Sequence, residues 1–328
     1  MFEIWIPLIG GLVLLVAGGD FLVRGAVQVA SRLGVSPLVI GLTLVGFGTS
    51  TPELVTSVQA ALNDSPGIAY GNIVGSNIAN ILLIVGASAI LFPIVVTSTA
   101  LKRDGMVMIA VAVSFAALAA IMPMERWLGA VFVAALAFYV YVAFRRERQS
   151  QAKVDHGAVY DKSIALQEAD PGTAPREAAG GSILVPLLIS GGGLVLVVLG
   201  GKLLVDGAVT LAQSFGISET VIGLTIVAVG TSLPEFVTSV LAAIRRQGDV
   251  AFGNIVGSNI YNILGIGGFT AIIAPGGVPV EIVSFDNLVM IGVSVLLVAF
   301  AWTGLRVARW EGMALLAGYA AYVYFIWP

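Results

Sequence analysis

Two glutamates in hydrophobic stretches of the chain directly follow a proline, and both belong to the same short motif. Residues 48–53 read Gly-Thr-Ser-Thr-Pro-Glu, and residues 230–235 read Gly-Thr-Ser-Leu-Pro-Glu. A proline cannot donate to the carbonyl four residues before it and clashes with that carbonyl, so a helix opens at this point. We therefore expect free carbonyl oxygens near residues 46–49 and 228–231, close to each glutamate.

Each motif also places a hydroxyl on the same side as the carboxylate. Thr49 lies four residues before Glu53, and Thr231 lies four residues before Glu235, so each pair shares a helix face. An ionised carboxylate inside a membrane is costly unless another group compensates its charge. Two facing carboxylates with hydroxyl and carbonyl oxygens would form a site of charge about −2, of the kind that Ca²⁺ prefers. Na⁺ fits the same oxygens and protons neutralise them, so the pattern indicates a site that competing cations share.

A second repeated motif adds polar residues to an otherwise hydrophobic segment. Residues 71–80 read Gly-Asn-Ile-Val-Gly-Ser-Asn-Ile-Ala-Asn, and residues 253–262 repeat them with Tyr in place of Ala. Polar side chains four residues apart lie on one helix face, and on this basis we predict four that line the site: Ser76, Asn80, Ser258 and Asn262. Four others stay open between site lining and hydrogen bonding between helices: Asn72, Asn77, Asn254 and Asn259. The two glycines of each copy, also four apart, favour close helix packing.

The alternative for a buried glutamate is a structural pair with a buried base. Apart from Arg32 at the end of the first segment, only Arg24 and Lys202 carry a positive charge within the hydrophobic segments. Each lies four residues after an acid of its own, Asp20 or Asp206, which favours an intrahelical pair. The sequence therefore predicts that the two motif glutamates have no basic partner. Two further acids begin hydrophobic segments and are interpreted as helix caps rather than ligands: Asp104 and Asp286.

Composition excludes a water-soluble protein. Hydrophobic residues make up 58% of the 328 residues and charged residues 11%, against about 25% charged in an ordinary globular domain. The chain has no cysteine and one histidine, which excludes thiol chemistry and leaves too few ligands for a zinc or haem centre. No dense basic cluster suggests nucleic acid. No nucleophile and base are paired, so we expect neither an enzyme nor a bound cofactor.

The two motifs belong to an internal repeat. Residues 41–82 and 223–264 align without a gap, with 27 identities in 42 positions. We therefore divide the chain into a first repeat at 1–144, a linker at 145–181 and a second repeat at 182–328. The linker is charged and lacks a sustained hydrophobic period, so we interpret it as an extramembrane segment with at most one short helix.

Each repeat contains five hydrophobic segments long enough to cross a membrane as helices. They lie near 5–33, 37–62, 68–92, 105–122 and 127–144, and near 183–215, 219–244, 250–273, 287–304 and 310–327. The first segment of each repeat is interrupted by charge, which fits one tilted helix or two pieces. The sequence predicts an all-α integral membrane protein with ten transmembrane helices in two inverted five-helix repeats.

The distribution of basic residues gives the orientation, because Lys and Arg concentrate on the cytoplasmic side. Five spans per repeat is an odd number, so the second repeat must enter the membrane from the opposite side. With both termini outside and the 145–181 loop in the cytoplasm, thirteen of the sixteen basic residues fall on the cytoplasmic side. This arrangement is what an inverted repeat requires.

At these motifs the sequence resembles the calcium/cation antiporter superfamily, specifically its sodium/calcium exchanger branch of bacterial and archaeal type. The resemblance covers both repeats. It implies ten spans, external termini, a cytoplasmic central loop and a location in the plasma (inner) membrane of a prokaryote. It also implies that the long first helix of each repeat slides during alternating access.

The resemblance further implies a set of ligands around Glu53 and Glu235. By the family pattern, oxygens come from side chains and from two carbonyls, at Thr49, Ser50, Thr231, Ser232, Ser76, Ser258, Gly46 and Ala228. Asn80 lines the middle position, and Asn262 occupies the matching place in the second repeat. No cofactor is implied, only Ca²⁺ and Na⁺ as transported ions and the lipid bilayer as surroundings; no feature identifies a protein partner.

Three functions remain open on these residues. Exchange of Ca²⁺ for Na⁺ leads, because the proton-coupled branch typically carries a glutamate in its GN motif that this chain lacks. Exchange of Ca²⁺ for H⁺ would use the same two glutamates as proton carriers. A cation channel is a more distant alternative, since acids and carbonyls also build selectivity filters.

One departure from the family pattern predicts independence from potassium. Some members have Asp where this chain has Asn262, and in potassium-dependent relatives that carboxylate accompanies the use of K⁺. With asparagine at both Asn80 and Asn262, the site has two carboxylates rather than three. Ca²⁺ uptake into membrane vesicles should therefore keep its rate when K⁺ is replaced by choline. Transport that stops without K⁺ would contradict this prediction.

Overall fold

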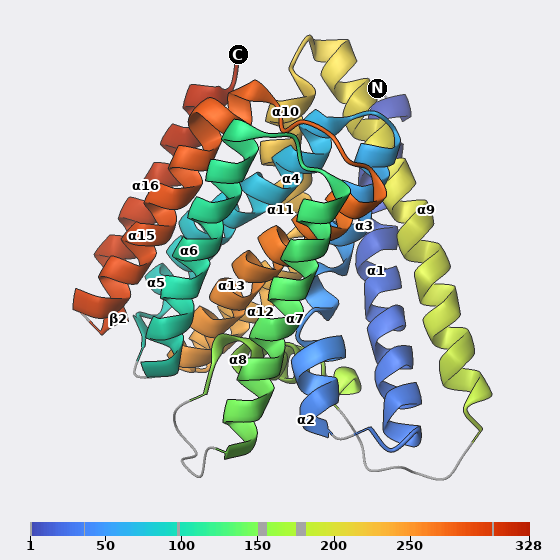
Figure 1. Ribbon diagram of the computed structural model, residues 1–328, viewed down its shortest axis with the longest axis vertical. Coiled ribbons are helices and arrows are strands. Elements are labelled where there is room, and N and C mark those ends of the chain that lie inside the picture. Colours follow the sequence, from blue (N-terminus) through green and yellow to red (C-terminus); the bar gives the residue numbers. More distant parts are fainter. Residues whose placement is uncertain (1, 36, 97–98, 150–155, 175–181, 304) are drawn as a thin grey trace.

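The computed structural model is a bundle of helices (Figure 1). It describes residues 2–35, 37–96, 99–149, 156–174, 182–303 and 305–328. The parts of the predicted linker at 150–155 and 175–181 lie outside the described residues. Both termini lie at one end of the bundle, and the linker helix α8 lies toward the other end (Figure 1).

The first repeat forms five helical segments, in the places that hydropathy predicts. Their bounds are α1 (Phe2–Arg32); α2 (Pro37–Ile40), η1 (Gly41–Val45), η2 (Gly48–Ser50) and α3 (Thr51–Leu62); α4 (Pro66–Ala79), η3 (Asn80–Val85) and α5 (Gly86–Leu91); α6 (Thr99–Ile121); and α7 (Arg126–Gln149). A two-residue strand, β1 (Ile94–Val95), lies between α5 and α6. The linker contributes α8 (Ala158–Ala169) and η4 (Pro171–Thr173).

The second repeat forms the matching five segments. Their bounds are α9 (Leu184–Phe215); α10 (Glu219–Ile222), η5 (Gly223–Val227), α11 (Ala228–Thr231) and α12 (Leu233–Ile244); α13 (Gly248–Tyr261), η6 (Asn262–Gly267) and α14 (Gly268–Ile273); η7 (Ile282–Asp286) and α15 (Asn287–Thr303); and α16 (Arg309–Ile326). The strand β2 (Arg306–Val307) pairs antiparallel with β1. Seven helices in the described part of the chain are long and apolar enough to cross a membrane, or eight with one bent pair. The predicted fold class is confirmed.

The first helices of the two repeats show the inversion directly. α1 runs away from the end that holds the termini and α9 runs toward it, side by side (Figure 1). Each is a single unbroken helix rather than two pieces, the other alternative that the sequence left open. A glycine with positive φ follows each helix: Gly34, at 77°, two residues after α1, and Gly216, at 66°, directly after α9. This backbone conformation ends helices, and glycine adopts it without strain.

Helices α4 and α13 form the centre of the bundle. Every residue of α4 from Gly67 to Ala79 is buried, as is every residue of α13 from Ala251 to Tyr261. A helix that is buried on all sides must place its polar side chains against other protein groups. The polar stripes of the second motif therefore face inward, toward the broken helices that carry the glutamates.

The helix irregularities repeat in both halves. Wider π-type turns form η1 and η5 near the first motif, and η3 and η6 begin at Asn80 and Asn262. Such turns are frequent at functional sites. The expectation of free carbonyls is wrong at two positions before Pro52: the Phe47 carbonyl accepts the Ser50 N–H, and the Gly48 carbonyl accepts the Thr51 N–H. The chain tightens into a 3₁₀ turn there, which satisfies these carbonyls locally.

The contact between α1 and α9 generates a stability prediction. A Cβ added at Gly11 would lie 2.5 Å from the backbone nitrogen of Leu204 and 2.7 Å from the Gly200 carbonyl oxygen, whereas a Cβ at Gly10 would meet nothing within 4 Å. Gly11→Ala should destabilise the detergent-solubilised protein by ~1–3 kcal/mol, because the backbones would have to separate. Gly10→Ala is the matched control and should melt like the wild type. Equal melting temperatures for the two variants would contradict the close contact.

Candidate cation site

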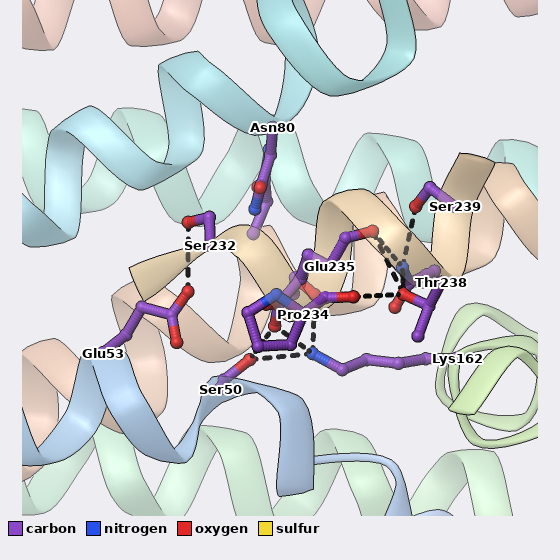
Figure 2. A network of polar contacts seen from close by, with 12 residues as sticks. Ser50, Glu53, Asn80, Lys162, Ser232, Pro234, Glu235, Thr238 and Ser239 are labelled. Carbon is purple, nitrogen blue, oxygen red and sulfur yellow. Dashed lines mark hydrogen bonds and ion pairs between the residues drawn. The ribbon is translucent and has the colours of Figure 1, made fainter. Parts of the chain in front are cut away.

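The two broken helices meet at their glutamates, and each repeat completes the other. The Ser50 hydroxyl donates to Glu235 Oε1 at 2.8 Å, and the Ser232 hydroxyl donates to Glu53 Oε1 at 3.0 Å (Figure 2). Each serine precedes the glutamate of its own repeat by three residues but bonds the glutamate of the opposite repeat. The structure therefore brings these four predicted site residues into one cluster.

The cluster is closed to solvent and rich in uncommitted oxygen. Glu53 is 2% exposed and Glu235 0%. Several buried oxygens receive no hydrogen bond from the residues that the structure describes: Oε2 of Glu53 and of Glu235, Oγ1 of Thr49, and Oδ1 of Asn80 and of Asn262. Buried polar atoms are normally paired. Carboxylate, hydroxyl and amide oxygens are the ligands that hard cations such as Ca²⁺ take, so this donor set fits a metal cation.

Two asparagines whose roles the sequence left open brace the helix breaks. Asn72 Nδ2 donates to the Glu53 carbonyl at 3.2 Å and to the Ser57 hydroxyl at 2.9 Å. Asn254 repeats this arrangement on the Glu235 carbonyl at 3.3 Å and adds Thr238 and Ser239 hydroxyls at 2.8 and 2.7 Å. These bonds hold the turn that carries each glutamate against the central helices.

The remaining polar residues of the central helices connect the two repeats. The Thr231 hydroxyl donates to Asn72 Oδ1 at 3.0 Å, and Ser76 approaches the same oxygen at 3.5 Å. Asn80 Nδ2 donates to Asn259 Oδ1 at 2.9 Å, so α4 and α13 are bonded directly. Asn77, by contrast, donates to the Ile73 carbonyl of its own helix at 2.8 Å.

The two predicted carbonyl ligands lie in different local settings. Gly46 is buried in the turn between η1 and η2. The Ala228 carbonyl accepts the Ser232 N–H at 3.1 Å and the Thr231 hydroxyl at 3.4 Å. Both donors belong to the second copy of the first motif, so the expectation of a free carbonyl is wrong at Ala228 as well.

A lysine from the linker enters the cluster, so the prediction that the glutamates have no basic partner is wrong. Lys162 of α8 is 1% exposed, and its Nζ lies 3.6 Å from Glu235 Oε1 (Figure 2). The same ammonium donates to the hydroxyls of Ser50 at 2.8 Å and Ser258 at 2.5 Å. Burial lowers the pKa of Lys162, which lies outside the spanning helices, and the two nearby carboxylates oppose that shift because they favour the charged form.

The linker sequence contained a weak signal for this insertion. Ala158, Val159 and Ala165 are buried beside Lys162, and Val159, Lys162 and Leu166 are spaced three and four residues apart, as on one helix face. The polar composition of the segment as a whole hides this short pattern. The linker is therefore not wholly solvated, because α8 packs against the helix bundle and buries Lys162.

Of the two charge pairs predicted within helices, one forms and the other does not. Arg24 pairs with Asp20 at 2.8 Å as expected, and also with Asp170 of the linker at 3.0 Å. Lys202 and Asp206 are both exposed and form no ion pair among the described residues.

The two predicted helix caps also differ from expectation, because both aspartates lie inside helices. Asp104 Oδ2 accepts the N–H of Ala158 at 2.8 Å, so it caps the linker helix α8 rather than its own helix. Asp286 accepts the Tyr322 hydroxyl at 2.8 Å instead of a backbone N–H at a helix start.

A cavity of about 410 Å³ adjoins the cluster. Its lining includes Thr49, Pro52 and Pro234 from the two breaks, and Leu166 and Asp170 from the linker. Within the described part of the chain, no three His, Cys, Asp or Glu side chains gather to form a conventional metal centre. The geometry thus favours a site with two carboxylates surrounded by neutral oxygens, reached from a space that the linker borders.

Comparisons with known proteins agree with this architecture. A family model described as sodium/calcium exchanger protein matches residues 3–145 and again 185–327. The sodium/calcium exchanger MaX1 of Methanosarcina acetivorans is 37% identical over 337 residues, covering 95% of each chain. The putative antiporter CaxA of Alkalimonas amylolytica is 37% identical over 321 residues, covering 96% of each chain. A solved structure of the sodium-calcium exchanger NCX_Mj, soaked with Na⁺ and Sr²⁺, has a TM-score of 0.62 at 32% identity over 98% of both chains.

Inverted helical repeats around a shared polar centre, together with these matches, define a membrane transporter of the exchanger class rather than an enzyme. The chain belongs to the sodium/calcium exchanger family. The resemblance inferred from the two motifs is confirmed, and the ten-helix, inverted-repeat architecture fits that family.

Proposed function

We propose that the protein is a secondary active antiporter that exchanges Ca²⁺ for Na⁺ by alternating access at the cluster between α3 and α12. The observation that carries the proposal is the cross-bonding of the two glutamates. Each accepts a serine hydroxyl of the opposite repeat through one oxygen, and its other oxygen has no donor among the described residues. Two such carboxylates attract cations, and their mutual repulsion in a closed site falls when a cation lies between them.

The proposed ligands are those that the family pattern implies, now with their geometry. They are Glu53, Glu235, Thr49, Thr231, Ser50, Ser232, Ser76, Ser258, Asn80, Asn262 and the carbonyls of Gly46 and Ala228. Nine of the ten side chains in this set are at most 2% exposed, and Thr49 is 4% exposed. We propose no resident cofactor, because Ca²⁺ and Na⁺ are the cargo.

Names of relatives support the choice of ions. MaX1 is named a sodium/calcium exchanger, and the NCX_Mj structures were obtained with Na⁺, Ca²⁺ or Sr²⁺. A site with two carboxylates and many neutral oxygens suits one divalent cation or several monovalent cations in turn. Coupling then follows because both ions need the same two carboxylates.

The antiparallel helices α1 and α9 are proposed to move during alternating access. They pack directly on the helix breaks: a Cβ added at Gly48 would lie 2.6 Å from Val23 of α1, and one added at Gly201 of α9 would lie 2.8 Å from Val55 of α3. Many of their other large hydrophobic side chains are exposed and suit contact with lipid. A displacement of this pair would uncover one break or the other.

For the arrangement in the membrane we propose the orientation that the basic residues favour. The repeats at 1–144 and 182–328 span the inner membrane of a prokaryote, the termini face outward, and the linker at 145–181 faces the cytoplasm. Relatives from bacteria and archaea support this setting. Figure 1 has the termini and α8 toward opposite ends of the bundle, as this orientation requires.

A flux measurement separates the proposed exchange from its alternatives. In proteoliposomes loaded with Na⁺, dilution into Na⁺-free buffer should drive ⁴⁵Ca²⁺ uptake while an ionophore collapses the pH gradient. The uptake should stop when Na⁺ is equal on both sides. Uptake that needs only a pH gradient would establish Ca²⁺/H⁺ antiport instead, and downhill Ca²⁺ current without any counter-ion would establish a channel.

Removal of either site carboxylate should abolish this flux. Glu53→Gln or Glu235→Gln keeps the size of the side chain but removes about half the negative charge that holds the divalent ion. We expect Na⁺-driven uptake at the level of empty liposomes for both variants, with unchanged elution on size exclusion. Glu125→Gln, at an exposed acid, is the matched control and should transport normally. Wild-type rates in either site variant would refute the proposed site.

A further inference from the structure

The ammonium of Lys162 has the surroundings of a bound cation. It contacts hydroxyl oxygens from both repeats, at Ser50 and Ser258, and faces the carboxylate of Glu235. An ammonium offers three donors and carries a full positive charge. All three partners belong to the proposed ligand set, so a metal cation and Lys162 cannot use these oxygens together.

The helix that carries Lys162 breaks the symmetry between the repeats. Gly71 and Gly75 of α4 lie against Gly223 and Leu224 of η5 in the opposite repeat. Their counterparts in α13 lie against α8 instead: a Cβ at Gly253 would meet Asp161, and one at Gly257 would meet Ala158 and Lys162. α8 thus takes the place beside α13 that η5 takes beside α4.

Contacts of three acidic residues fasten α8 in that place. Asp104 of α6 accepts the N–H of Ala158 at the start of the helix, at 2.8 Å. Near the end of α8, Glu168 pairs with Arg245 at 3.3 Å and accepts from Gln247 at 2.8 Å.

The third contact joins the linker to the first spanning helix. Asp170, directly after α8, pairs with Arg24 of α1 at 3.0 Å. The linker is therefore bonded both to the central site and to one of the helices that we propose to move.

We propose that α8 is an internal inhibitory plug, in which Lys162 acts as a tethered competitor of the transported cation on the linker side of the site. The proposal rests on the proposed function, because the atoms that Lys162 occupies are proposed ligands. A cation that enters from the linker side must displace the ammonium. The pair between Arg24 and Asp170 holds α1 to the plug until the plug leaves the site.

The energetic consequence is a reduced apparent affinity for cations. With Lys162 in place, the charge of the cluster is about −1 rather than about −2, because one ammonium offsets one carboxylate. When the site is free to bind a cation for only a fraction of the time, the apparent Kd equals the intrinsic Kd divided by that fraction. The plug therefore sets the cation concentration at which transport begins.

Calcium binding to the full-length, detergent-solubilised protein tests this directly. Isothermal titration with CaCl₂ should give a Kd for Lys162→Met that is ~10-fold or more below the wild-type value. Lys202→Met is the matched control, because Lys202 is exposed and does not contact the site, and its Kd should equal that of the wild type. A Lys162→Met Kd within twofold of the wild-type value, or above it, would overturn the plug.

A second variant keeps Lys162 and loosens only its anchors. The double substitution Glu168→Ala and Asp170→Asn removes the pairs with Arg245 and Arg24, which are partly exposed and individually weak. Its Kd should fall between the wild-type and Lys162→Met values. If Lys162→Met elutes as aggregate, the double variant tests the plug alone. A Kd of the double variant equal to the wild-type Kd would then overturn the plug.

Limited proteolysis gives a readout that a merely structural lysine would not change. Trypsin should cut after Lys162 slowly in Ca²⁺-free wild type and faster in saturating Ca²⁺, because the ion displaces the side chain. In Glu235→Gln the rate should not respond to Ca²⁺, which controls for effects on trypsin itself. A Ca²⁺-independent rate in the wild type counts against the plug.

The outcomes separate this inference from the proposed function. If no protein binds Ca²⁺ or supports Na⁺-driven uptake, the proposed function fails and the plug fails with it. If the wild type transports and Glu235→Gln does not, but Lys162→Met binds Ca²⁺ like the wild type, then only the plug fails.

Discussion

Two carboxylates buried side by side at the centre of an apolar helical bundle impose the constraint on which the rest of this structure depends. A buried charge is stable only with a counter-charge or with several hydrogen bonds. The protein supplies one serine hydroxyl from the opposite repeat to each carboxylate and one lysine to the pair. Among the proposed ligands, the buried side-chain atoms without a partner in the described part of the chain are five oxygens and one nitrogen, Nδ2 of Asn262, so the cluster can accommodate a cation.

The helix breaks follow from that constraint. An intact helix would use its own carbonyls and would not allow two chain segments to meet end to end at their first turns. Prolines at positions 52 and 234 open the helices, and Asn72 and Asn254 on the central helices hold the turns that follow. The polar stripes of α4 and α13 can be buried only because the broken helices give them partners. The two motifs therefore depend on each other, because each supplies hydrogen-bond partners for the buried polar groups of the other.

Much of this arrangement could be predicted from the sequence, for physical reasons. Hydrophobic segments near membrane thickness locate the spans, and the internal repeat with an odd number of spans per half dictates the inversion seen in α1 and α9. The PE motifs identify Glu53 and Glu235 because ionised residues are rare in such segments. Local rearrangement was harder to predict: the carbonyls before Pro52 find new donors in a 3₁₀ turn, a choice that depends on geometry rather than on residue type.

The partners of Lys162 could not be predicted, because its burial depends on contacts between segments distant in the chain. The residues that dock α8, Asp104 and Gly253, belong to two different helices, and nothing in the polar linker indicates which helices it meets. If the protein alternates between inward- and outward-open arrangements, as we propose, the similarity of the repeats gives these two arrangements similar energies. The linker occurs once, and its helix α8 lies against α13 of the second repeat, in the place that η5 takes beside α4. A contact made in one of two otherwise equivalent states must shift the balance between them, so the asymmetry of this exchanger lies in its least membrane-like segment.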